Sequence, residues 1–232
     1  YDGAHVLGLI AGGQFQDPLR EGADLMTGSS HKTFPGPQGG FLLSSSEDET
    51  FHRRLNNAMF PGVCSSYHLH HVAGKVMALA EFMEYGEAYA TDIVSNARAF
   101  AGALAAEGFD VLAESRGYTA SHQVLTRHGE LDSGAGAKAA QRLEEAGIIT
   151  NMNMLPGDTK AMTPSGLRLG VQELTRVGFS NDDMEEVASF YARVLLHGED
   201  PAAVRADVHA LKQQRQTIRY CFNEDERSGY PE

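Results

Sequence analysis

Short apolar runs separated by glycine and polar residues dominate the start of the chain. Residues 6–10, 22–27 and 40–44 are bounded by turn-forming residues, a pattern typical of short buried strands. Residues 47–57 have helical spacing instead, with Ser46 as a candidate N-cap before an acidic first turn. The pattern predicts strands and glycine-rich turns, followed by a helix.

Longer stretches with helical spacing follow. Residues 68–106 predict one long helix, interrupted or bent near Gly86. Beyond it, short apolar strands alternate with helices that have clear signals, such as Gly147 after one helix and Asp200-Pro201 before another. We predict strands at residues 109–113, 121–126, 148–150 and 167–169, and helices at residues 136–146, 181–196 and 201–219.

This order of elements indicates two α/β regions. Residues 1–82 predict the end of one α/β domain, and residues 83–232 predict a smaller second one. The chain opens at Tyr1 in what resembles a strand end, with no initiation segment or cap. We therefore expect either that the chain lacks an N-terminal half or that its numbering starts inside a longer protein.

Composition narrows the classes of function. The chain has 232 residues and a formal net charge of −12, which argues against nucleic acid or an anionic membrane as a partner, because both attract clustered Lys and Arg. No apolar run approaches the roughly 18 residues of a membrane span, and we see no signal peptide. Cys64 and Cys221 are too few for a disulfide framework, so we expect a cytoplasmic location.

A lysine among small hydroxyl-bearing residues is the most informative candidate for chemistry. Lys32 lies in a glycine- and proline-rich stretch, residues 27–40, well after Asp2. A pyridoxal phosphate (PLP) enzyme needs a lysine that forms a Schiff base with the cofactor and an acid that keeps the pyridine nitrogen protonated. Taken alone, Lys32 would be a solvated surface lysine and Asp2 a strand-end cap. The surrounding motifs decide between these interpretations.

The order of these motifs resembles the serine hydroxymethyltransferase family. The resemblance covers nearly the whole chain and implies a PLP-dependent transferase fold of the aspartate aminotransferase-like α/β type. It also implies that the chain holds the end of the large domain and the small C-terminal domain, without the first half. The motifs are Asp2-x-x-His5, His31-Lys32-Thr33, Gly36-Pro37-x-Gly39-Gly40, Phe60-Pro61-Gly62, His70-x-x-Ala73-Gly74-Lys75 and Ser165-Gly166-Leu167-Arg168-Leu169-Gly170.

The resemblance assigns cofactor roles to several residues. Lys32 is the Schiff-base lysine, Asp2 pairs with the pyridinium nitrogen, and His5 contacts the phenolic oxygen of PLP. Ser29 and His31 line the phosphate and substrate side, where hydroxyl and imidazole donors meet phosphate oxygens. The alternative for His5 is a hydrogen-bonded histidine of the core.

The resemblance also assigns a substrate role to Arg168, which holds the α-carboxylate of the amino acid. A guanidinium presents a rigid fork that matches a carboxylate through two hydrogen bonds. The alternative is a surface arginine, although a strand between Leu167 and Leu169 is an unusual place for one.

Departures from the family pattern fall around the acceptor side of the site. Most members carry a glycine pair that reaches the cofactor phosphate of the neighbouring subunit, where this chain has Ser65-Ser66. The common arginine six residues past the lysine is Gln38 here, and residues 155–164 are unlike the usual segment near folate. These departures resemble an archaeal-type branch and also the threonine transaldolases. These departures therefore leave open whether the protein binds tetrahydrofolate or a related pterin.

A histidine cluster invites a metal interpretation that we do not favour. Imidazoles at His68, His70 and His71 are possible ligands, but their spacing fits no standard zinc pattern. We expect no metal, with His70 as the family's histidine and the others as packing or rim residues.

The function expected from the resemblance is aldol and retro-aldol transfer on a β-hydroxy-α-amino acid, serine or threonine, through a glycine carbanion. The partners would be this amino acid, an aldehyde or one-carbon acceptor, and a second subunit in a homodimer that shares the site. Two alternatives stay open: an L-threonine transaldolase, and a non-catalytic half of a split PLP-fold protein.

Overall fold

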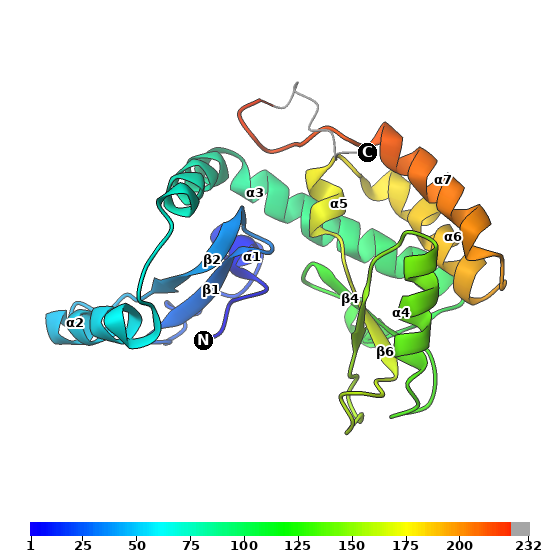
Figure 1. The fold of residues 1–232 in the computed structure, drawn as a ribbon, viewed down its shortest axis with the longest axis horizontal. Helices are drawn as coiled ribbons and strands as arrows, with labels where there is room; N and C mark the ends of the chain where they lie inside the picture. The colour runs from blue at the N-terminus through cyan, green and yellow to red at the C-terminus, as the bar shows by residue number, and fades with distance from the viewer. Residues whose placement is uncertain (224–232) are drawn as a thin grey trace. The chain divides into compact units, whose positions relative to one another are not determined.

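The computed structural model describes residues 1–223 and falls into two compact units (Figure 1). The first is Tyr1–Ala90 and the second starts at Thr91, so the division lies inside the long helix α3, Leu69–Ala106. The sequence places the change of domain in the same helix, after residue 82. Identification of the two units with a large-domain end and a small domain stays a prediction.

An antiparallel hairpin forms the centre of the first unit. Strand β1, Met26–His31, pairs with β2, Pro35–Leu43, and their register shifts between Ser29 and His31. Both strands were predicted, but β1 begins later and β2 begins earlier than the apolar runs indicate. Phe34 at the turn is buried together with Leu7, Met26 and Ala78, so the turn is part of the core of this unit.

Residues 6–10 are mainly helical, and the strand predicted there is wrong. Helix α1, Leu7–Ala11, ends at Gly12, whose N–H donates to the Gly8 carbonyl at 2.9 Å. A short apolar run does not distinguish a strand from a buried helix. Contacts of Gly8 decide here, because its N–H donates to Thr33 Oγ1 at 3.0 Å and an added Cβ would overlap the Thr33 backbone.

Helix α2, Glu49–Asn57, confirms the predicted helix but corrects its cap. Asp48 is the N-cap, since its carboxylate accepts the Thr50 N–H at 2.8 Å, whereas Ser46 accepts the N–H of Asp48. The π-helical segment η1, Ala58–Val63, follows and contains a cis Phe60–Pro61 bond. Helix α3 is confirmed, and it continues without interruption through Gly86.

An antiparallel sheet organises the second unit. The strand predicted at residues 148–150 is wrong: the chain leaves the preceding helix through Gly147 (φ 77°), and Ile149 is 88% exposed. The strand forms just afterwards, where residues 151–153 pair with their neighbour. The sheet order is β3 (Asp110–Val111), β4 (Gln123–Arg127), β6 (Gly166–Gly170) and β5 (Asn151–Asn153).

Helices cover this sheet in two steps. Helix α4, Ala135–Glu145, packs on β5 and β6, and the pair α6, Met184–Leu195, and α7, Pro201–Gln214, packs on α4 (Figure 1). The helix predicted at 181–196 begins as a 3-10 turn, η3, Asn181–Asp183. The helix predicted at 201–219 ends early, at Gln214, because the backbone of Arg215 is not helical (φ −127°, ψ 73°). The Arg215 guanidinium donates to the Asp183 carboxylate at 2.7 Å. Two further short helices of this unit are η2, Glu114–Arg116, and α5, Gln172–Arg176.

In the core of the second unit, the sheet and its covering helices pack against the second half of α3. Phe100 of α3 packs edge-on against Tyr191 of α6, with ring centroids 5.5 Å apart. Leu143 of α4 and Leu167 of β6 are fully buried. Within residues 1–223, no helix is both long and apolar enough to cross a membrane.

Candidate active site

The turn of the β1–β2 hairpin carries Lys32, the first residue after β1. Its side chain is half-buried, and its Nζ lies 3.3 Å from Nε2 of His5. Among the residues that the structure describes, no carboxylate forms an ion pair with this amine. An amine next to an imidazole and without a carboxylate partner is suited to act as a nucleophile.

Thr33 fixes the backbone of His5 beside this lysine. Its hydroxyl donates to the His5 carbonyl at 2.9 Å and accepts the Gly8 N–H at 3.0 Å. The side chain is fully buried, so both hydrogen bonds are shielded from water. Thr33 is part of the motif His31-Lys32-Thr33, but the sequence predicted no role for it. Its hydroxyl, directly after the candidate nucleophile, was the one feature that could have indicated a role.

Asp2 is held against the start of β1. It forms an isolated parallel bridge with Thr27, and its Oδ1 accepts the Ala4 N–H at 2.9 Å and lies 3.5 Å from Thr27 Oγ1. The side chain is exposed, and within residues 1–223 its Oδ2 has no hydrogen-bond partner. This oxygen can therefore accept a hydrogen bond from a ligand.

Alternation along β1 separates the two serines of the motif. Met26, Gly28 and Ser30 are buried, whereas Ser29 is half-buried and His31 is exposed. The Ser30 hydroxyl donates to the Pro37 carbonyl at 2.6 Å, so it connects the two strands of the hairpin. Ser29 and His31 thus share the open face of the strand.

His31 also contacts the opposite strand. Its Nδ1 lies 3.3 Å from the carbonyl oxygen and 3.4 Å from the N–H nitrogen of Gly39. The tautomer decides which hydrogen bond forms, and either one holds the ring beside β2.

The predicted phosphate-side serines, Ser65 and Ser66, lie in the exposed segment between η1 and α3. Within the described residues, no hydrogen bond links them to the lysine turn. Their role at the phosphate of a neighbouring subunit stays a prediction.

Three imidazoles gather around the start of α3. Ring centroids of His70 and His71 are 4.4 Å apart, and His68 lies 5.5 Å from His70 and 5.4 Å from His71. Desolvation, followed by repulsion from the other two rings and Lys75, lowers the pKa of His71. The part of the chain that the structure describes contains no cluster of three or more His, Cys, Asp or Glu arranged to hold a metal ion.

Arg168 is the middle residue of β6, in the second unit. Its neighbours Leu167 and Leu169 point into the core, whereas Arg168 is half-buried on the other face, with Leu125 and Asn151 beside it in register. Within residues 1–223, no carboxylate or carbonyl accepts a hydrogen bond from its guanidinium. The group is therefore available to an external anion.

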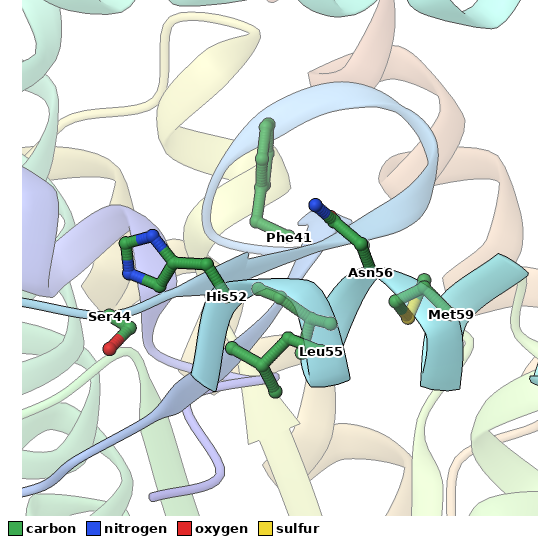
Figure 2. Close-up of a pocket in the computed structure, with 8 residues that line it drawn as sticks. Phe41, Ser44, His52, Leu55, Asn56 and Met59 are labelled. Atoms are coloured by element: carbon green, nitrogen blue, oxygen red, sulfur yellow. The ribbon is translucent and has the colours of Figure 1, made fainter. Parts of the chain in front are cut away.

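A pocket of about 390 Å³ lies outside this constellation, between β2 and α2 (Figure 2). None of its lining residues is a predicted site residue. They come from β2 and its end, from α2 and from the start of η1: Gly40, Phe41, Leu42, Ser44, His52, Leu55, Asn56 and Met59.

A family comparison shows where the motifs of the lysine turn occur among known proteins. Residues 1–191 match the family model described as serine hydroxymethyltransferase. The chain belongs to the serine hydroxymethyltransferase family. The matched residues contain the lysine turn and β6 together, so the motifs on which the resemblance was based occur in their family context.

Curated serine hydroxymethyltransferases from archaea are similar over nearly the entire chain. The enzyme from Pyrococcus abyssi is 59% identical over 227 residues, which are 96% of this chain and 53% of that protein. The enzyme from Methanocella arvoryzae is 52% identical, across 97% of this chain and 52% of that protein. The chain therefore spans about half the length of these relatives.

A solved structure confirms the fold class. The crystal structure of L-threonine transaldolase from Pseudomonas fluorescens, in its internal aldimine state, superposes with a TM-score of 0.89. It is 33% identical in sequence, and the match covers 98% of this chain and 51% of that one. The predicted α/β PLP-dependent transferase fold is confirmed, as is the predicted resemblance to both the archaeal-type branch and the transaldolases.

Proposed function

We propose that the chain belongs to a PLP-dependent enzyme that performs aldol and retro-aldol transfer on serine or threonine. The observation that carries this proposal is the half-buried Lys32 amine, which has the His5 imidazole and no carboxylate as a described partner. Membership of the serine hydroxymethyltransferase family and the likeness to a threonine transaldolase support it.

The side chains of the lysine turn fit PLP. Lys32 would hold the cofactor through its aldehyde, and His5 would lie at the phenolic oxygen. The Oδ2 of Asp2, which has no partner among the described residues, would accept a hydrogen bond from the pyridine nitrogen. Ser29 and His31, on the open face of β1, would line the phosphate and substrate side. When bound, PLP withdraws electrons from the bonds at the α-carbon of the amino acid joined to it.

Two residues of the chain would handle the substrate and its protons. Arg168 would bind the α-carboxylate through two parallel hydrogen bonds, because its guanidinium has no described partner to compete. His5 can take the proton that the Lys32 ammonium must lose before the amine attacks a carbonyl carbon. Retro-aldol cleavage then divides serine into glycine and formaldehyde, or threonine into glycine and acetaldehyde.

Completion of the site is part of the proposal. We expect a homodimer in which Ser65 and Ser66 reach the cofactor phosphate of the neighbouring subunit, and an N-terminal half that supplies the rest of the cofactor pocket. The exposure of both serines is compatible with such a contact.

The experiment is a product profile of the longest natural polypeptide that contains this chain, loaded with PLP. Glycine formed from serine only with tetrahydrofolate supports the hydroxymethyltransferase. Acetaldehyde formed from threonine without folate, together with a new β-hydroxy amino acid when a second aldehyde is present, supports the transaldolase. Absence of glycine from both substrates in a folded, PLP-loaded protein contradicts the proposal.

A threonine transaldolase is the second candidate, favoured by the likeness to the Pseudomonas fluorescens structure. A non-catalytic PLP-fold protein is the third candidate. Absence of a lysine-bound PLP absorption band, even with an N-terminal half supplied, would favour this third candidate.

A further inference from the structure

Two carboxylates clamp together the loops that precede α4 and β6. The N–H of Asp132 donates to Asp158 Oδ1 at 2.7 Å. In return, the N–H groups of Thr159 and Lys160 donate to Asp132 Oδ1, both at 2.8 Å, and the Thr159 hydroxyl donates to its Oδ2 at 2.7 Å. Asp132 adopts a left-handed backbone conformation, with φ 57°, and this network stabilises it.

Asp158 reaches from this clamp to the beginning of β6. Its Oδ2 accepts the N–H of Ser165 at 3.0 Å, the Ser165 hydroxyl at 2.8 Å and the N–H of Leu155 at 2.8 Å. These hydrogen bonds hold the carboxylate ionised and lower the pKa of Asp158, against the opposing effect of desolvation. One carboxylate therefore fixes two backbone positions next to the strand.

Ser165 and Leu155 both contact or adjoin the first residue of β6, the strand that carries Arg168. Ser165 is fully buried, directly precedes Gly166, and accepts the His128 N–H at 2.9 Å through its carbonyl. Leu155 packs on Gly166 so closely that a Cβ there would overlap its side chain. The first residue of β6 is thus held from two directions by groups that Asp158 orders.

The guanidinium of Arg168 has no described hydrogen-bond partner, so the backbone of β6 supplies the fixed point from which this side chain extends. A two-pronged hydrogen bond to a carboxylate requires a specific orientation of both groups. We propose that Asp158 is a positioning residue, which acts through Ser165 and Leu155 to set Arg168 for the substrate α-carboxylate. This inference rests on the proposed function of Arg168.

The test measures binding of glycine and of glycinamide, which lacks the carboxylate, by spectroscopic titration of the PLP-loaded polypeptide described above. Asp158→Asn replaces an acceptor oxygen by an amide NH₂ and should weaken glycine binding roughly tenfold, as expected when a charge-assisted contact is disturbed. Glycinamide binding should change less than about twofold. In the unliganded protein, amide hydrogen exchange over Gly166–Gly170 should become faster.

A matched control is Asp183→Asn. Asp183 also accepts the N–H and hydroxyl of a serine, Ser180, at 2.8 and 3.2 Å, but it belongs to the start of α6 rather than to the sheet. This variant should lose stability and keep its affinity for glycine. If Asp158→Asn does not fold, Ser165→Ala removes one of the same hydrogen bonds and should shift glycine binding in the same direction by a smaller factor.

A double-mutant comparison distinguishes an effect of Asp158 through Arg168 from a general disturbance of the fold. In an Arg168→Lys background, Asp158→Asn should have little further effect on glycine binding. Equal weakening of glycine and glycinamide, or an undiminished effect in that background, would overturn the positioning role while leaving the proposed function intact. Wild-type affinity for glycine in Arg168→Lys itself would contradict the proposed carboxylate site and the inference with it.

Discussion

The Nε2 atom of His5 lies 3.3 Å from the Nζ of Lys32, across a separation of 27 residues in the chain. The link is maintained from the other side of the histidine, where Thr33 binds its carbonyl oxygen. A hydrogen bond from the Thr33 hydroxyl to the His5 backbone and a contact between the His5 and Lys32 side chains thus connect residue 5 with residues 32–33, and each can be removed separately.

Replacement of Thr33 by Val removes the hydroxyl and keeps the shape of the side chain. The carbonyl of His5 and the N–H of Gly8 would both lose a buried partner, so we expect a decrease of about 1–3 kcal/mol in the free energy of unfolding. Urea denaturation measures it. The control Thr50→Val alters an exposed hydroxyl and should change the free energy by less than about 0.5 kcal/mol. Equal effects of the two variants would contradict the role given to Thr33.

Glycine-to-alanine substitutions in two helices should have opposite signs. Gly8→Ala in α1 forces a methyl group into the Thr33 backbone, and we expect a loss of about 1–3 kcal/mol. Gly102→Ala in α3 meets no atom within 4 Å and should raise stability by up to about 1 kcal/mol, because alanine favours the helix. Thermal unfolding of both variants checks this contrast; stabilisation by Gly8→Ala would disprove the close approach.

The difference between predicted and observed elements follows from the length of each pattern. The long helix α3 was predictable because its apolar spacing repeats over many turns. Short apolar runs carry less information. Residues 6–10 are mainly helical, and Gly8 contacts Thr33 there. Strand β5 forms after residues 148–150, where the chain pairs with β6. Tertiary pairing decided both cases.

Arg168→Lys keeps the charge and removes the planar fork. If Arg168 binds the α-carboxylate, the KM for serine or threonine should rise roughly tenfold or more in steady-state kinetics. Arg127→Lys, on the neighbouring strand β4, changes an exposed pair with Asp110 and should leave the KM unchanged. An unaltered KM in Arg168→Lys would exclude a direct contact between this residue and the substrate.

Acidification should destabilise the fold in two stages. Burial lowers the pKa of His128 from 6.5 to about 4, so the unfolded chain binds more protons between these values and stability falls as the pH falls through this window. The expected slope for this one group is at most about 1.4 kcal/mol per pH unit. Below this window, Asp158 and Asp183, whose pKa values are lowered by hydrogen bonds, lose their contribution as they become protonated.

Urea denaturation at a series of pH values tests the first stage. His128→Gln should flatten the dependence between pH 6.5 and about 4, whereas His209→Gln, at an exposed position, should leave it as in the wild type. A slope that survives in His128→Gln would assign the acid sensitivity to other groups.

The candidate site could be predicted only from side chains whose chemistry matches a motif of the family. Lys32, Asp2, His5 and Arg168 are candidates because the resemblance to the family assigns them roles that suit an amine, an acid, an imidazole and a guanidinium. These roles stay predictions. The connection between Asp132 and Asp158 could not be predicted from the sequence. It joins positions 26 residues apart through backbone N–H groups, which are the same in any sequence. Thr33 belongs to the same class, as its importance depends on burial.

The most direct test of the account is to identify the lysine that holds PLP. The polypeptide is loaded with PLP, reduced with borohydride to make the attachment permanent, and mapped by peptide mass spectrometry. We predict a phosphopyridoxyl group on Lys32, and loss of the label in folded Lys32→Ala with retention in Lys138→Ala, an exposed lysine of α4. Attachment at another lysine, or an unchanged label in Lys32→Ala, would contradict the central claim.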